Sequence, residues 1–189
     1  MPRRQSATTF VALLRGVNVG GKNMIAMSSL KASFERMRLR DVATYINSGN
    51  VLFKAAEADA RKLEKRLEAM LARDHRLECK VVVRSFLEMS RLVESLPATW
   101  TGDKEWRYNV IFLRHTIDSE HLVRDLQAKP DIEEVLYRPG TLLWSAHVRH
   151  ITRTAMLRLP GQRIYQDMTV RNLNTTRKLH QLMAKMDAG

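Results

Sequence analysis

The sequence predicts an α+β fold of two ferredoxin-like α/β plaits joined by a connecting helix. Short β-branched or apolar runs alternate with amphipathic stretches, and turn-forming residues separate the expected strands. The resulting order, β-α-β-β-α-β, is that of the plait and occurs twice along the chain. The expected organisation is an N-terminal plait over residues 8–84, a connecting helix and loop over 85–106, and a C-terminal plait over 107–189.

Each element of the first half follows from its local pattern. A run of five apolar residues within 9–15 predicts a buried strand, and Ser28 or Ser29 offers an N-cap for the helix that follows. Between two β-branched runs lies Asn47-Ser48-Gly49-Asn50, which predicts a hairpin because these residues tolerate a left-handed backbone. The remaining expected elements are strands over 42–46, 51–53 and 80–84 and an amphipathic helix over 58–73.

The second half shows the same order of elements with one added helix. Arg138-Pro139-Gly140 has the composition of a tight turn and predicts a second hairpin. The expected elements are helices over 86–94, 118–127, 151–159 and 175–186, strands over 108–113 and near 165–168, and a strand-turn-strand over 137–144.

Composition limits the class of protein. Of the 189 residues 44% are hydrophobic and 28% are charged, which is typical of a globular chain and excludes disorder, collagen and a disulfide scaffold. The single cysteine, Cys79, precedes a strand and is expected to be a buried packing residue rather than a nucleophile. The longest N-terminal apolar run, residues 10–14, is too short for a membrane helix, so we expect a cytoplasmic protein with no membrane partner.

The net charge of +12 is concentrated toward the C-terminus. From Val135 onward nine Lys and Arg face two Asp, and no acidic residue lies between Glu134 and Asp167. Clustered arginine is typical of a protein that binds a polyanion or a phosphorylated ligand. An Arg-rich codon usage, with 22 Arg against 10 Lys, explains the same excess equally well.

A glycine-rich loop over residues 16–23 matches part of a phosphate-binding motif. Gly16, Gly21 and Lys22 satisfy the G-x4-G-K spacing, but Asn23 replaces the Ser or Thr that binds Mg²⁺, so we exclude an NTPase. The loop remains a candidate for holding an anion through backbone N–H groups, with Lys22 and Arg15 as charges. The alternative is a long connecting loop that needs glycine for its turns.

Two other stretches are candidates for an anion site and a metal site. Residues 169–176 are expected to lead into the last helix, where Arg171 is unfavourable toward the helix dipole and therefore points to an anion. His147 and His150 are expected to be solvated surface residues, because no acid or cysteine nearby completes a metal set. We expect neither a metal nor a cofactor.

Three stretches resemble signature sequences of the bacterial domain of unknown function 1697 family. They are residues 10–23 (FVALLRGVNVGGKN), 45–53 (YINSGNVLF) and 169–179 (TVRNLNTTRKL). The resemblance implies two α/β-plait subdomains and implies no activity, because the family is uncharacterised. It covers Arg15, Gly16, Asn18, Gly20, Gly21, Ser48, Gly49, Asn50, Arg171, Asn172 and Thr175.

This sequence departs from the family at one place. Similar proteins show Arg-Ser-Lys before the penultimate helix, where this chain has Arg153-Thr154-Ala155. Arg153 and the hydroxyl of Thr154 replace that triplet in part, and the missing Lys weakens the case for a shared phosphate pocket.

Three functions stay open at this point. The first is binding of a phosphorylated or nucleotide-like anion in a cleft between the plaits; the second is nucleic-acid binding by the basic C-terminal half; the third is a small enzyme acting on a phosphorylated metabolite. The expected ligand-binding residues are Arg15, Gly16, Asn18, Gly20, Gly21, Lys22, Ser48, Gly49, Asn50, Arg153, Thr154, Arg171, Asn172 and Thr175. The oligomeric state does not follow from the residues.

Overall fold

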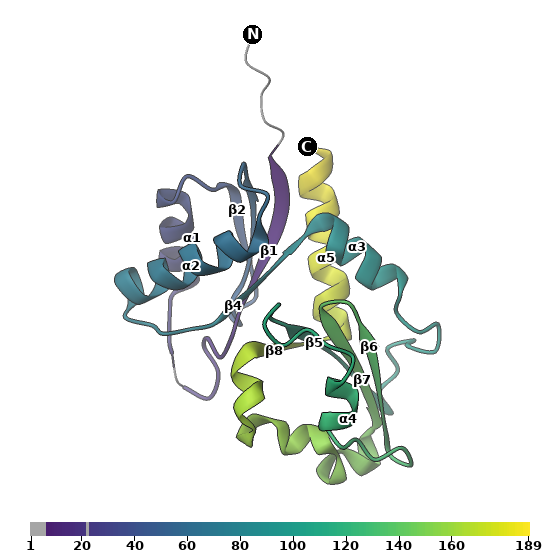
Figure 1. Cartoon of the computed structure of the whole chain (residues 1–189). Coiled ribbons are helices and arrows are strands. Elements are labelled where there is room, and N and C mark those ends of the chain that lie inside the picture. The colour runs from purple at the N-terminus through teal and green to yellow at the C-terminus, as the bar shows by residue number, and fades with distance from the viewer. Residues whose placement is uncertain (1–6, 22) are drawn as a thin grey trace. The chain divides into compact units, whose positions relative to one another are not determined.

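The structure is a computed structural model that describes residues 7–21 and 23–189, and it is a mixed α+β protein with two four-stranded antiparallel sheets (Figure 1). The chain divides into two compact units. Unit 1 runs up to Ser90 and also contains Leu179–Gly189, and unit 2 comprises Arg91–Lys178. Among the described residues, no helix has both the length and the apolar character needed to cross a bilayer.

The sheet of unit 1 has the strand order β2-β3-β1-β4, and every neighbouring pair is antiparallel. Phe10 of the central strand β1 faces Phe53 of β3 on one side and Ser85 of β4 on the other. The bounds of the elements in this part of the chain are β1 (Thr8–Leu14), α1 (Met27–Arg36), β2 (Arg40–Tyr45), β3 (Asn50–Ala55), α2 (Ala60–His75), β4 (Val81–Ser85) and α3 (Phe86–Glu94).

Hydrophobic burial on one face of this sheet joins it to α1 and α2. Phe10 and Phe53 stack with their ring centroids 5.8 Å apart, and Phe34 of α1 meets Phe53 edge-on at 5.7 Å. From α2, Leu63 and Leu67 enter the same core and are fully buried. Fully burying such side chains contributes about 1.5–3 kcal/mol each, so this face supplies much of the stability of unit 1.

Helix α2 also covers the exposed hydrogen-bonding edge of the sheet. Strand β4 pairs only with β1, which leaves its outer N–H groups facing away from the sheet. The Glu64 carboxylate accepts a hydrogen bond from the backbone N–H of Val83 at 3.0 Å, and Glu68 accepts one from Val81 at 3.1 Å. These contacts protect an edge that would otherwise be open to pairing with another chain.

The sheet of unit 2 repeats the strand order, β6-β7-β5-β8, again with every neighbouring pair antiparallel. Its core joins Ile111, Leu142 and Trp144 of the sheet to Leu122 of α4. The bounds of the elements in this part of the chain are β5 (Trp106–Leu113), α4 (Leu122–Asp125), β6 (Glu133–Arg138), β7 (Thr141–His147), the 3-10 helices η1 (Val148–Arg153), η2 (Ala155–Leu157), η3 (Leu159–Gly161) and η4 (Arg163–Asp167), β8 (Met168–Asn172) and α5 (Leu173–Ala188).

The predicted α+β class and most elements are confirmed. Both hairpins form, with Gly49 at φ +69° and Gly140 at φ +79° in their turns. The helix expected over 86–94 is α3 with the same bounds. Cys79 is buried, and its thiol donates to the carbonyl of Arg15 at 3.1 Å, as a packing residue does.

Three predicted elements of unit 2 are wrong. The helix expected over 118–127 is reduced to α4, because i→i+3 turns precede it and Gln127 has a left-handed backbone at its end. The helix expected over 151–159 is a run of 3-10 turns, since Thr154 is extended and Pro160 has no N–H to donate. The strand expected near 165–168 lies at Met168–Asn172 instead.

Gly49 is the position at which the fold of unit 1 tolerates least change. A Cβ there would lie 2.8 Å from the Cβ of Leu14 and 3.2 Å from that of Val17, and the φ of +69° strains any L-residue. We predict that Gly49→Ala lowers the free energy of unfolding by about 3 kcal/mol, from overpacking together with left-handed strain.

Gly20→Ala is the matched control for this prediction. Gly20 has φ +59° but nothing within 4 Å of an added Cβ, so only the strain of about 1 kcal/mol remains. Urea unfolding of both variants measures the difference. If both variants lose the same free energy of unfolding, Gly49 is not packed against Leu14 and Val17 as described.

Candidate functional site

The predicted site residues of unit 1 come together where the loop after β1 meets the β2–β3 turn. Asn18 connects the two segments: its side-chain oxygen accepts from the N–H of Ile25 at 2.7 Å, and its amide nitrogen donates to the carbonyls of Ile25 and Asn47, each at 2.9 Å. Asn23 closes the loop by donating to the carbonyl of Gly16 at 3.0 Å. The loop is therefore held to the hairpin by its own asparagines.

The hairpin residues of the motif are also engaged in the fold. The side-chain amide of buried Asn50 donates to the carbonyl of Tyr45 and to the hydroxyl of Ser48, both at 3.1 Å. The carbonyl of Gly49 accepts from the N–H of Leu14 at 2.8 Å. These contacts explain the motif as turn chemistry, which was the alternative reading for Asn47-Ser48-Gly49-Asn50.

Gly20 and Gly21 are the residues of this loop that the packing does not account for. Both are exposed, both have positive φ, and neither has a heavy atom within 4 Å of an added Cβ. Arg15 is half-buried, and Lys22 lies outside the described residues. The expectation of an anion at this loop stays a prediction.

In unit 2 the predicted residues lie at the end of η1 and from β8 to the start of α5. Arg171 is corrected from loop to strand: it belongs to β8, is buried, and donates to the hydroxyl of Thr169 and the carbonyl of Val170, both at 2.8 Å. Its guanidinium is therefore engaged within the strand that leads directly into the last helix. Asn172 has the capping role instead, because its side-chain oxygen accepts from the N–H of Thr175 at 2.7 Å.

Arg153 and Thr154 end the 3-10 helix η1. Arg153 is exposed, and its carbonyl accepts from the ammonium of Lys129 at 2.8 Å. Thr154 is buried with its hydroxyl donating to the carbonyl of Ile151 at 2.8 Å. The Thr154 hydroxyl is thus engaged in closing a turn.

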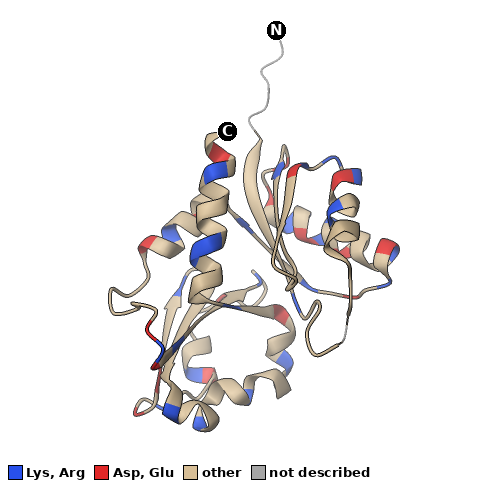
Figure 2. Cartoon of the chain, turned by 180° about the vertical axis from the view of Figure 1, so that it is seen from behind, with Lys and Arg blue, Asp and Glu red and all other residues tan. Residues whose placement is uncertain are grey.

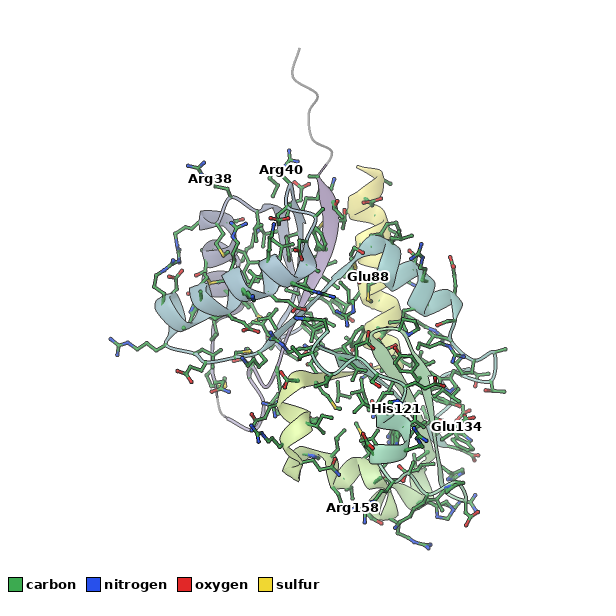
Figure 3. The ribbon with its side chains drawn as sticks, in the orientation of Figure 1. Arg38, Arg40, Glu88, His121, Glu134 and Arg158 are labelled. Carbon is green, nitrogen blue, oxygen red and sulfur yellow. The ribbon has the colours of Figure 1, made fainter. Side chains whose placement is uncertain are left out.

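A groove of about 870 Å³ in unit 2 was missed by the sequence analysis. It is lined by the start of β5, the end of β7 with η1, β6, and α4 with the turn that follows it. Figure 3 labels Glu134 of β6, which lines the groove, and His121 of the turn before α4, which holds a lining arginine. The polar and aromatic side chains that line it are Trp106, Arg124, Gln127, Asp131, Glu133, Glu134, His147, Arg149 and His150.

An aromatic row leads to this groove. Trp106 is directly opposite His147 in the β5–β7 pairing, and the two rings meet edge-on at 5.6 Å. His147 in turn lies edge-on to His150 at 6.2 Å, and Trp106 is 39% exposed. The predicted solvated histidines are therefore half-buried members of an aromatic cluster.

Hydrogen bonds set the orientation of His147. Its Nδ1 accepts from both the backbone N–H and the side-chain Nε of Arg149, each at 3.2 Å. Because Nδ1 is an acceptor, a neutral ring has its proton on Nε2, 3.8 Å from a carboxylate oxygen of Glu105. Arg149 is thereby fixed beside the imidazole with its guanidinium exposed at the groove.

Asp103 fixes the start of β5 and so the position of Trp106. Its carboxylate accepts from the backbone N–H groups of Glu105 and Trp106 at 2.9 and 3.0 Å. The same carboxylate accepts from the phenol of Tyr108 at 3.4 Å. Burial, together with the negative charge of Asp103, raises the pKa of Tyr108 above its ordinary value, so the phenol stays a hydrogen-bond donor.

Buried Glu133 holds together the segments around the groove. One carboxylate oxygen accepts from the backbone N–H groups of Lys129 and Ala155 at 3.0 and 2.7 Å, and the other accepts from the indole of Trp144 at 2.7 Å. This single side chain ties the loop after α4, the 3-10 segment and the core of the sheet together.

Sequence signals for this groove exist but are weak. Trp106 and His147 face each other only because β5 and β7 pair in one register, which the residues do not reveal. Glu133 at the first position of a strand was a usable signal, since a carboxylate beside apolar residues needs partners when buried. Within the part of the chain that the structure describes, no group of three His, Cys, Asp or Glu is arranged to hold a metal ion.

Removing the Glu133 carboxylate tests whether it supports the groove. We predict that Glu133→Ala lowers the free energy of unfolding by about 4 kcal/mol, because buried donors lose a charged acceptor. Glu133→Gln keeps the shape and costs about 2 kcal/mol. Glu134→Gln, at the next and exposed position, is the control and changes stability by less than about 0.5 kcal/mol in urea unfolding. Equal effects at the two positions would contradict the role of Glu133.

Comparison with known proteins gives relatives but no activity. The structure is similar to that of a conserved bacterial protein, SP0830 from Streptococcus pneumoniae, with a TM-score of 0.83 and 26% identity over 94% of this chain and 99% of that chain. An unknown protein from Galdieria sulphuraria shares 14% identity over 89% of this chain and 99% of its own, with a TM-score of 0.27, too low to bear on the fold. No curated protein matches the chain.

The family comparison covers two of the three signature stretches, residues 10–23 and 45–53, while the third, 169–179, lies beyond the matched residues. The pattern of the family described as "Protein of unknown function (DUF1697)" matches residues 7–144, which is more than half of the chain. The chain therefore belongs to the DUF1697 family of proteins of unknown function.

Proposed function

We propose that the protein binds a nucleotide-like anion in the groove of unit 2. The observation that carries this proposal is the exposed indole of Trp106 lining the same groove as the guanidiniums of Arg124 and Arg149. An open aromatic face binds a base by stacking, and an arginine fork binds a phosphate through paired hydrogen bonds.

The contacts around these groups favour binding with little rearrangement. Trp106 is held by its backbone bond to Asp103 and by its pairing with His147, so its ring is in place before a ligand arrives. Arg149 is held through His147. Fixed groups lose less conformational entropy on binding, which raises the affinity for a given set of contacts.

The charges of the groove favour a ligand with both a polar base and an anionic end. Glu133 accepts hydrogen bonds from three donors, which offset part of its negative charge. Glu134 and Asp131 line the same groove as Arg149, and their oxygens are suited to the amino groups of a base. The proposed ligand therefore stacks on Trp106 with its phosphate toward Arg149.

Two probes separate the two halves of the proposed ligand. Adenosine reports stacking, and AMP adds the phosphate. We predict that Trp106→Ala weakens binding of both at least tenfold, because stacking on an aromatic ring contributes about 1–3 kcal/mol per base. Arg149→Gln weakens AMP binding at least tenfold and leaves adenosine binding unchanged, since a hydrogen bond to a charged group contributes about 1.5–3 kcal/mol. Isothermal titration calorimetry measures both.

Arg163→Gln is the control for charge. Arg163 is an exposed residue of the same unit that does not line the groove, so its loss leaves both affinities unchanged. If Arg149→Gln and Arg163→Gln weaken AMP binding equally, the loss reflects the overall charge of the unit and not a specific contact between Arg149 and the phosphate. Product analysis of the same samples reports any turnover, which is the open alternative of a small enzyme.

A second candidate function, nucleic-acid binding, is favoured by one observation. The 3-10 segment η1–η4 presents four exposed arginines, of which Arg158 projects outward in Figure 3, and blue segments mark this ribbon in Figure 2. Affinity for single-stranded RNA that falls with salt at a slope of about −0.7 per neutralised phosphate would support this function.

We also propose the ferredoxin-like α/β plait as the arrangement of both units. The strand orders β2-β3-β1-β4 and β6-β7-β5-β8, each built from a β-α-β-β chain order, support it. Unit 2 has 3-10 turns where the second plait helix is expected. An experimental structure of the protein tests this assignment.

A further inference from the structure

A second groove, of about 480 Å³, lies in unit 1 between the C-terminal end of α1 and the side of α2. Four arginines line it and no acidic residue does; they are Arg36, Arg38, Arg66 and Arg73. Arg38 projects from the turn after α1, at the same end of the unit as Arg40 (Figure 3). This groove shares no residue with the one in unit 2.

Two of the arginines are held in position by Asp74. One oxygen of its carboxylate accepts from Nε of Arg73 at 2.7 Å, and the other accepts from the guanidinium of Arg36 at 3.0 Å. Arg36 also donates to the hydroxyl of Ser33 at 2.7 Å. These hydrogen bonds hold the pKa of Asp74 well below its usual range, so the carboxylate is charged at neutral pH.

The two held guanidiniums remain accessible to a ligand. The side chains of Arg36 and Arg73 are 61% and 70% exposed although each is anchored to Asp74. Each guanidinium carries five N–H donors, and the anchoring bonds use only some of them. Asp74 therefore orients two arginine forks without covering them.

Arg38 and Arg66 have no such compensation. Both are exposed, and neither guanidinium has a hydrogen-bond or ion-pair partner among residues 7–21 and 23–189. Bringing four guanidiniums to one groove is unfavourable in the free protein, because like charges repel and Asp74 is held by only two of them. An anion in the groove relieves that repulsion.

We propose that the arginine groove of unit 1 binds closely spaced phosphate groups. Arginine forks match phosphate oxygens through paired hydrogen bonds, and four of them suit a ligand that carries more than one phosphate. No aromatic side chain lines the groove, so its ligand is recognised by charge and not through a base. This site is separate from the nucleotide-like ligand proposed for unit 2.

Helix stabilisation alone does not account for the cluster. A basic residue in the last turn of a helix interacts favourably with the helix dipole, and Arg36 in α1 and Arg73 in α2 have that position. Arg66 lies in the middle of α2, where the dipole offers nothing, and Arg38 follows the end of α1. The convergence of all four on one groove is the feature that an anion explains.

Closely spaced phosphates occur in a free oligophosphate and in a nucleic-acid backbone, and two probes distinguish these sources. Inorganic tripolyphosphate represents the first, and a ten-residue oligothymidylate represents the second. Binding of each is measured by calorimetry and by thermal unfolding of the full chain at fixed ionic strength. The test variant is Arg38→Gln with Arg66→Gln, which leaves the Asp74 contacts in place.

The control variant is Arg61→Gln with Lys65→Gln. Both residues are exposed on α2 outside the groove, so this pair removes the same charge from the same unit. We expect the test variant to lose at least tenfold in affinity for the probe that binds, and the control to lose less than twofold. Without any anion, the test variant should unfold at the same or a higher temperature than the parent protein, because repulsion has been removed.

The outcomes separate this site from the one in unit 2. Loss of tripolyphosphate binding alone supports a free oligophosphate, and loss of oligothymidylate binding as well supports a nucleic-acid backbone. Equal losses in the test and control variants, or no binding of either probe by the parent protein, overturn the proposal. A loss with Arg149→Gln and none with the test variant also overturns it, because the phosphates would then bind in unit 2.

Discussion

The carboxylate of Glu133 is the constraint on which unit 2 depends. It is buried at the start of β6, where it accepts hydrogen bonds from two backbone N–H groups and from the indole of Trp144. Burying a charge is costly unless it is compensated, and these three donors provide the compensation. In return the carboxylate holds the turn after α4 and the first residue of η2 against the sheet. The groove forms because the turn after α4 is held in place beside β5 and β7.

The strands were largely predictable because their signals are local. Apolar runs at β1 and β5 and turn residues at Gly49 and Gly140 identify the strands and hairpins without knowledge of the rest of the chain. The helical stretches of unit 2 were not predictable in the same way. The apolar spacing over 151–159 is compatible with an α-helix. The segment forms 3-10 turns instead, because the backbone of Thr154 is extended and Pro160 has no N–H to donate.

The candidate sites show where sequence reasoning stops. Motif residues such as Asn18 and Asn50 are predicted ligand-binding residues, and the structure gives both of them bonds that hold a loop and a turn. Arg171 precedes the last helix as expected, but it lies in strand β8, which was predicted only near 165–168. The grooves depend on partners far apart in sequence: Trp106 with His147, and Arg36 with Asp74. The positions of these residues along the chain do not indicate that they contact each other.

The three tryptophans allow the central claim to be tested directly. Trp106 is 39% exposed, whereas Trp100 and Trp144 are each 2% exposed, so the three indole N–H groups sit in different environments. The measurement is a titration of ¹⁵N-labelled protein with AMP, followed by NMR at the indole N–H resonances. If AMP stacks in the groove of unit 2, the Trp106 resonance shifts progressively and saturates, while that of Trp144, bonded to Glu133, stays in place. A Trp106 resonance that does not move while AMP binds would place the ligand elsewhere and contradict the account.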